Sequence, residues 1–163
     1  MAGMNADRAT SIAFLMWLGA VIVCSLGFGV TLIYLRGHPP GPEPVPLGQT
    51  LIPAAVVAVA LAAAGGFTHR YLFRRYWKDG LVQPHGFLIA SAVLWGCLTP
   101  AVLTPLVGAM IERRLAPNIL VSTILLLLLL GTWPSGRAMR VRRAREAEDD
   151  DVELLHLPPD DEP

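Results

Sequence analysis

Residues 86–111 read GFLIASAVLWGCLTPAVLTPLVGAMI and contain no charged side chain. A helix needs about 20 apolar residues to cross the hydrocarbon core of a bilayer, which is about 30 Å thick. Three further stretches, residues 11–35, 47–68 and 115–134, are also free of charge. Because lipid offers no partner for bare N–H and C=O groups, each stretch is expected to be a helix. The sequence therefore predicts an all-α integral membrane protein, a bundle of four transmembrane helices.

The overall composition also argues against a water-soluble domain. The chain has 163 residues, of which 53% are hydrophobic and 16% are charged, whereas soluble domains carry about 25% charged residues. The first apolar stretch is longer than the 7–15-residue core of a secretory signal peptide, and no small-residue cleavage pattern follows it. We therefore expect it to remain in the protein as the first transmembrane helix.

The segments between the apolar stretches predict the orientation of the chain. Ten of the 13 Lys and Arg residues fall on one side of the predicted bundle, and such residues favour the cytoplasmic side. Both termini are therefore expected in the cytoplasm. Arg outnumbers Lys by twelve to one, which suggests a GC-rich genome. We therefore expect a bacterial inner membrane. The expected segments are the N-terminus (1–10), a proline-rich outer loop (36–46), a cytoplasmic loop (69–85), a second outer loop (112–114) and a tail (135–163).

The cytoplasmic loop and the start of the tail interleave aromatic and basic residues, a pattern typical of the lipid headgroup region. Nine of the 13 acidic residues lie in residues 146–163, so the rest of the tail is expected to be acidic and disordered. A protein partner bound to this tail stays an open alternative. The predicted anchors, expected to contact anionic headgroups, are Arg70, Tyr71, Arg74, Arg75, Tyr76, Trp77, Lys78, Arg137 and Arg140.

Small residues at every fourth position mark the faces on which membrane helices approach closely. By contrast, the leucine run of residues 115–134 predicts a helix that faces lipid. Pro100 and Pro105 each follow a threonine and predict a kink in the helix at 86–111. The predicted helix-packing residues are Gly19, Gly27, Ala54, Ala58, Ala62, Gly66 and Gly96.

No predicted helix carries Asp, Glu, Lys, Arg or His in its middle, where proton relays and ion pathways place such residues. Glu112 is followed by Arg113 and Arg114, and we interpret this group as a solvated interfacial ion pair of small energetic value. The chain has no nucleophile elbow, phosphate-binding glycine loop or zinc motif. We therefore expect no enzyme activity, no metal and no cofactor. Nucleic-acid binding is not expected either, because the basic residues flank apolar stretches.

His69 and His85 border consecutive predicted helices at the same edge. We interpret them as surface histidines, with ligation of a haem or a metal as the alternative. The function expected from these observations is that of a structural, accessory or assembly component of a membrane complex, as a homo- or hetero-oligomer. The alternative is a small oligomeric transporter or channel that uses the kinked third helix.

Overall fold

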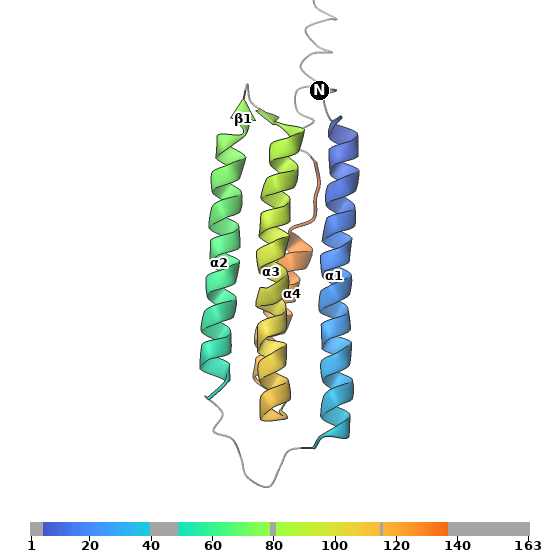
Figure 1. Ribbon diagram of the computed structural model, residues 1–163, viewed down its shortest axis with the longest axis vertical. Helices are drawn as coiled ribbons and strands as arrows, with labels where there is room; N and C mark the ends of the chain where they lie inside the picture. The colour runs from blue at the N-terminus through green and yellow to red at the C-terminus, as the bar shows by residue number, and fades with distance from the viewer. Residues whose placement is uncertain (1–4, 40–48, 79–80, 115, 137–163) are drawn as a thin grey trace, which may run out of the picture.

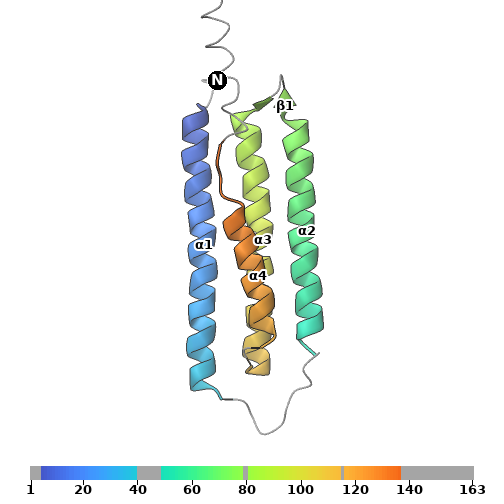
Figure 2. The ribbon, with the colours of Figure 1, turned by 180° about the vertical axis from the view of Figure 1, so that it is seen from behind.

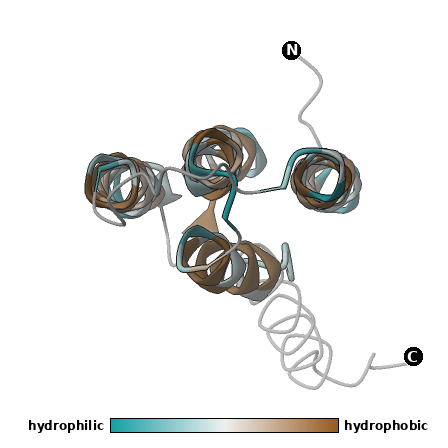
Figure 3. Ribbon diagram, turned by 90° about the horizontal axis from the view of Figure 1, so that it is seen from below, coloured by the Kyte–Doolittle hydropathy of each residue, from teal (hydrophilic) through white to brown (hydrophobic). Residues whose placement is uncertain are grey.

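Helix α3 (Pro84–Glu112) occupies the centre of a bundle of four helices. The structure is a computed structural model and describes residues 5–39, 49–78, 81–114 and 116–136. Helices α1 (Ala6–Gly37) and α2 (Leu51–Arg75) flank α3, and α4 (Asn118–Gly131) packs on one side of it (Figures 1, 2 and 3). The predicted all-helical class is confirmed, apart from one small hairpin.

Helices α1, α2 and α3 have 32, 25 and 29 residues. At 1.5 Å per residue each is longer than the hydrocarbon core of about 30 Å. All three are long and apolar enough to cross a membrane. Their outer faces expose large apolar side chains such as Leu26, Ile33 and Val56, which are typical of lipid contact rather than of a soluble monomer. The predicted membrane character is therefore confirmed for these three helices.

Close helix contacts fix the position of α3 between α1 and α2. A Cβ added at Gly27 of α1 would lie 2.5 Å from a side-chain carbon of Leu103. A Cβ added at Gly65 of α2 would lie 2.7 Å from the Cβ of Cys97. Of the most apolar 18-residue stretch of each helix, 44% is buried in α3 but only 11% in α1 and 17% in α2. Helix α3 is therefore the core element of the bundle.

A short hairpin closes the connection between α2 and α3. Strands β1 (Trp77–Lys78) and β2 (Leu81–Val82) pair antiparallel, with Trp77 opposite Val82. The predicted cytoplasmic loop 69–85 is therefore smaller than expected, because α2 continues to Arg75 and α3 begins at Pro84. The basic and aromatic residues that suggested a loop extend the helix instead. Gly86 allows this turn, since a side chain there would collide with the ring of Tyr76.

Helix α4 is shorter than the predicted fourth helix at 115–134. It has 14 residues, which span only about 21 Å. Pro134 has no N–H and fixes its own backbone angle, so it stops the helix from continuing. Residues 132–136 form no helix or β-strand, and this irregular segment continues towards the start of α1 (Figure 2). A Cβ added at Gly136 would lie 2.6 Å from the hydroxyl of Thr10, so the described ends of the chain lie at one end of the bundle.

Several predicted features fall outside the described residues. They are most of the proline-rich outer loop, the acidic tail, Arg137, Arg140 and the side chain of Lys78.

Candidate functional site

The C-terminal end of α4 lies inside the bundle, and its backbone is paired there by side chains of other helices. The carbonyl oxygen of Leu129 accepts a hydrogen bond from the indole Nε1 of Trp17 at 3.0 Å. The hydroxyl of Thr132 donates to the same oxygen at 2.7 Å and accepts from Nε1 of Trp95 at 3.0 Å. A helix end leaves its last carbonyls without partners. Trp17 of α1 and the hydroxyl of Thr132 satisfy this one, and Trp95 of α3 holds that hydroxyl in place.

Contacts between aromatic rings hold the irregular segment of residues 132–136 against α1. The ring of Trp133 lies 4.7 Å from that of Trp17 and 5.3 Å from that of Phe14, both edge to face. Such pairs contribute about 0.5–1.5 kcal/mol each beyond the burial of their surface. Trp17 thus contacts both α4 and the irregular segment that follows it.

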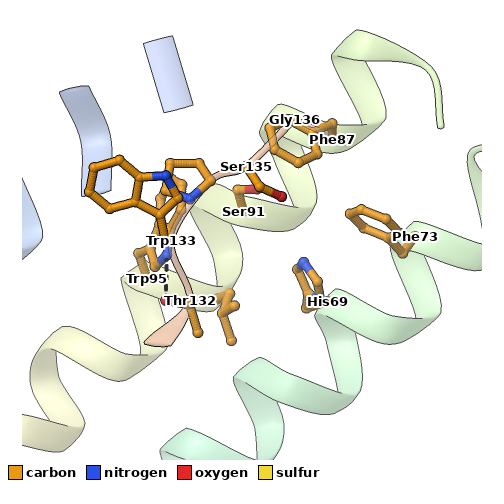
Figure 4. Close-up of a pocket in the computed structure, with 11 residues that line it drawn as sticks. His69, Phe73, Phe87, Ser91, Trp95, Thr132, Trp133, Ser135 and Gly136 are labelled. Carbon is orange, nitrogen blue, oxygen red and sulfur yellow. Dashed lines mark hydrogen bonds between the residues drawn. The ribbon is translucent and has the colours of Figure 1, made fainter. Parts of the chain in front are cut away.

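A pocket of about 240 Å³ lies on the other side of this irregular segment, between α2 and α3 (Figure 4). Four aromatic side chains line this pocket, and its polar side chains come from α2, from α3 and from residues 132–136. The residues used below are His69 and Phe73 of α2, Phe87, Ser91 and Trp95 of α3, and Thr132, Trp133 and Ser135 of the last segment.

Two polar side chains of this pocket have no hydrogen-bond partner within the described part of the chain. Ser91 is only 4% exposed, and neither its hydroxyl nor the imidazole of His69 makes a hydrogen bond with any residue that the structure describes. The ring of His69 instead lies 4.9 Å from that of Phe73. Thr132 is fully engaged by Trp95 and Leu129. The pocket therefore presents a free imidazole and a free hydroxyl between aromatic walls.

A second polar cluster lies at the opposite end of the bundle. The carboxylate of Glu112 is only 5% exposed. It accepts hydrogen bonds from the N–H and the hydroxyl of Thr50 and from Nδ2 of Asn118, with N···O distances of 3.2 Å and 3.1 Å for the two nitrogen donors. Thr50 precedes α2 and Asn118 begins α4, so the positive N-terminal ends of two helices face this carboxylate.

This arrangement corrects the interpretation of Glu112 as a solvated ion pair. Within the described ranges no ion pair joins Glu112 to Arg113 or Arg114, and the side chain is buried. Thr50 and Asn118 were missed because they are distant or lie beyond a turn, and no local spacing indicated them. The Oδ1 atom of Asn118 is buried without a partner, against the backbone of Gly108.

Comparison with known proteins found no match. No family model, no curated protein and no solved structure matches this chain.

The residues predicted to pack helices fall into two groups. Ala54 and Ala58 are buried, and Ala62 packs partly buried against the core. Gly27 lies against Leu103, as described above. A Cβ added at any of the remaining three would meet nothing within 4 Å. These three open positions are Gly19, Gly66 and Gly96.

The predicted anchors on α2 are mostly exposed. Arg70, Tyr71 and Arg74 line a shallow depression together with Phe67, on the surface of the bundle. Arg75 and Trp77 are also exposed, whereas Tyr76 is half-buried over Gly86. His85 is exposed and does not line the pocket of His69. In the described part of the chain, no group of three His, Cys, Asp or Glu residues gathers where it would hold a metal.

Both predicted kink residues, Pro100 and Pro105, lie within α3, which continues through them. The hydroxyl of Thr99 donates to the carbonyl of Trp95, and that of Thr104 donates to the carbonyl of Pro100, each at 2.8 Å. Pro105 is buried and Pro100 is exposed. The two prolines therefore face different surroundings.

Proposed function

We propose that this chain is an integral membrane protein that crosses the bilayer four times, with α4 and residues 132–136 together forming the fourth crossing. Helix α4 supplies about 21 Å of this crossing. The irregular segment continues from it to Thr10, near the start of α1. Irregular backbone is tolerated at membrane depth where protein groups cover it. Two hydrogen bonds support the proposal, because the indole of Trp17 donates to the helix-end carbonyl of Leu129 and that of Trp95 donates to the hydroxyl of Thr132. The count of Lys and Arg on each side favours cytoplasmic termini, and the excess of Arg over Lys favours a bacterial inner membrane.

Within that membrane, the role that we propose is a non-catalytic component of a larger assembly. The observation that carries it is an uncovered face of α3. Gly96, Pro100, Val107 and Ile111 are all exposed, and their spacing places them on one stripe of the helix. This stripe lies between the contacts with α1 and α2, on the side opposite α4 (Figure 3). The most buried helix of the bundle thus has one bare side.

Small residues are what allow helices to associate in lipid, because the two backbones can approach closely there. Gly96 and Pro100 give the bare stripe such a surface at its N-terminal end, near the middle of α3. We therefore assign it to an apolar transmembrane helix of a partner protein, seated between α1 and α2. The exposed basic residues on α2 fit contacts with anionic headgroups around this assembly, and the acidic tail is a second surface for a partner.

A catalytic role finds little support in the pocket chemistry. Ser91 and His69 line the same pocket, but no hydrogen bond joins them in the described structure. An activated serine needs a base within hydrogen-bonding distance and a third group that orients the base. None of the described residues that line this pocket is a carboxylate.

The assembly role is tested by site-specific photo-crosslinking in native membranes. A photoreactive amino acid is introduced at Val107, which is 54% exposed on the stripe, and as a control at Leu127, which is 62% exposed on α4. We expect a discrete protein adduct from position 107 and only lipid adducts from position 127. Lipid adducts from both positions would contradict the proposal. An adduct of twice the chain mass would identify the partner as a second copy.

A second candidate, an oligomeric transporter or channel, is favoured by one specific observation. The hydroxyl of Thr104 lies beside the same open stripe and is bonded only to the carbonyl of Pro100 among described residues. In an oligomer, this stripe would line a shared path. Solute flux into reconstituted vesicles that falls with Thr104→Val would support this candidate, and vesicles that stay tight under all tested gradients would contradict it.

A further inference from the structure

We propose that the pocket beside residues 132–136 binds the ring of a lipid-soluble quinone. This inference goes beyond the assembly role and concerns a different surface from the stripe of α3. It rests on the size of the pocket, on its aromatic walls and on the two polar groups that lack partners.

The dimensions of the pocket suit a single substituted ring. Pockets for drug-sized ligands measure about 300–1,000 Å³, and this one measures about 240 Å³. Its aromatic lining consists of Phe73 of α2, Phe87 and Trp95 of α3, and Trp133 of the irregular segment. Aromatic side chains favour a planar partner, with which they stack offset or edge to face. A flexible acyl chain would use this geometry less well.

The polar groups of the pocket suit a ring that carries carbonyl oxygens. His69 enters from α2 and Ser91 from α3, so their donors come from different walls (Figure 4). A neutral imidazole offers one N–H, and a serine hydroxyl offers one O–H. A quinone has two carbonyl acceptors on opposite sides of its ring. The hydroxyl of Ser91 faces this pocket and makes no hydrogen bond with any described residue, so a ligand carbonyl can accept from it.

The neighbouring polar groups do not compete for this ligand. Trp95 donates its N–H to Thr132, and Thr132 donates its hydroxyl to Leu129. These bonds hold two walls of the pocket in place, so little ordering is needed when a ring enters. His69 and Ser91 are then the free donors aimed at it, with the exposed Ser135 near the rim.

The charge and position of the pocket favour a neutral ligand that arrives from the membrane. Among the residues that the structure describes, no Asp, Glu, Lys or Arg lines it, so these residues offer an anion or a metal ion no compensating charge. His69 lies six residues before the end of α2 at Arg75, which is about 9 Å along the helix. This depth is close to the membrane interface, where the polar ring of a quinone meets its apolar tail.

The test uses the full-length protein in lipid nanodiscs and titrates decylubiquinone as the probe. Trp95 and Trp133 line the pocket, so a bound quinone should quench tryptophan fluorescence to a saturating level. Ser91→Ala and His69→Phe should each weaken the saturable binding about tenfold, the effect of one lost hydrogen bond. Matched controls are Thr123→Val and His85→Phe, whose exposed side chains lie outside the pocket; both should bind as the wild type does.

Two results would overturn the proposal. One is quenching that rises in proportion to quinone in the membrane without saturating, or that is identical in all variants. The other is equal displacement of the probe by decanol, which has the chain but no ring and would show that the pocket takes an alkyl chain. Where Ser91→Ala alters the melting temperature, Ser91→Cys keeps a similar volume with a weaker donor and should give an intermediate affinity.

Discussion

The indole Nε1 of Trp17 donates a hydrogen bond to the carbonyl oxygen of Leu129, 3.0 Å away and 112 positions later in the chain. The bond joins the first helix to the last turn of α4, next to the irregular segment of residues 132–136. The same indole packs edge to face on Trp133 of that segment. Trp17 therefore contacts both α4 and the segment that follows it.

Trp17→Phe should lower the stability of the protein in detergent micelles. The substitution keeps an aromatic ring beside Trp133 but removes the donor to Leu129 and part of the buried surface, at a combined cost of about 2 kcal/mol. Thermal unfolding monitored by circular dichroism measures the change. Trp77→Phe is the control, because Trp77 is 53% exposed. Equal melting temperatures for both variants would show that the bond contributes little.

Gly65→Ala and Gly66→Ala should change stability in opposite directions. The new Cβ at position 65 would lie 2.7 Å from the Cβ of Cys97, whereas at position 66 it would meet nothing within 4 Å. Overpacking costs about 1–3 kcal/mol, and replacing an unpacked helix glycine by alanine gains up to about 1 kcal/mol. Melting temperatures of the two variants in the same micelles measure the difference. If both variants melted together, the predicted contact between α2 and α3 would be wrong.

Glu112→Ala should destabilise the end of the bundle away from the termini. It removes the acceptor for Thr50 and Asn118 and leaves a buried amide unpaired, which costs about 3 kcal/mol. Hydrogen exchange should rise at the first turns of α2 and α4 and stay unchanged near Trp95. Arg113→Ala is the control, since that neighbouring side chain is exposed. Similar exchange in both variants would argue for a solvated carboxylate after all.

The proposed four crossings predict which positions react from each side of the membrane. Single cysteines introduced at Ser11 and Ser135 should react with an impermeant thiol reagent from the cytoplasmic side. A cysteine at Gly37 should react from the opposite side, because one helix length separates it from Ser11. All three positions are exposed. Labelling of Ser135→Cys and Gly37→Cys from the same side would remove the fourth crossing.

Length and the absence of charge were enough to predict α1, α2 and α3. A continuous run of about 20 or more apolar residues has one stable form in lipid. The end of α4 was not predictable in this way, because the apolar run continues to Pro134 while the helix ends at Gly131. The helix stops before Pro134, where Thr132 and Trp17 both donate to the carbonyl of Leu129, and no local pattern reveals the contact with Trp17.

The polar sites show the same limit at the level of single residues. Glu112 was assigned to its basic neighbours because they adjoin it in sequence, whereas its partner Thr50 lies 62 positions away. Gly65 and Gly66 are adjacent, but successive residues point about 100° apart around a helix. Only the rotation of α2 against α3 determines which glycine makes the close contact, and that rotation is a property of the folded bundle.

The shortness of α4 has a consequence for how the protein is made. Fourteen residues of helix form too brief a segment to enter a bilayer independently. Helix α1 is synthesised before this segment, and Trp17 can then donate to the carbonyl of Leu129. We therefore expect the proposed fourth crossing to integrate late and to depend on its contact with α1. A truncated chain that starts after α1 should leave its last segment stranded on the membrane surface.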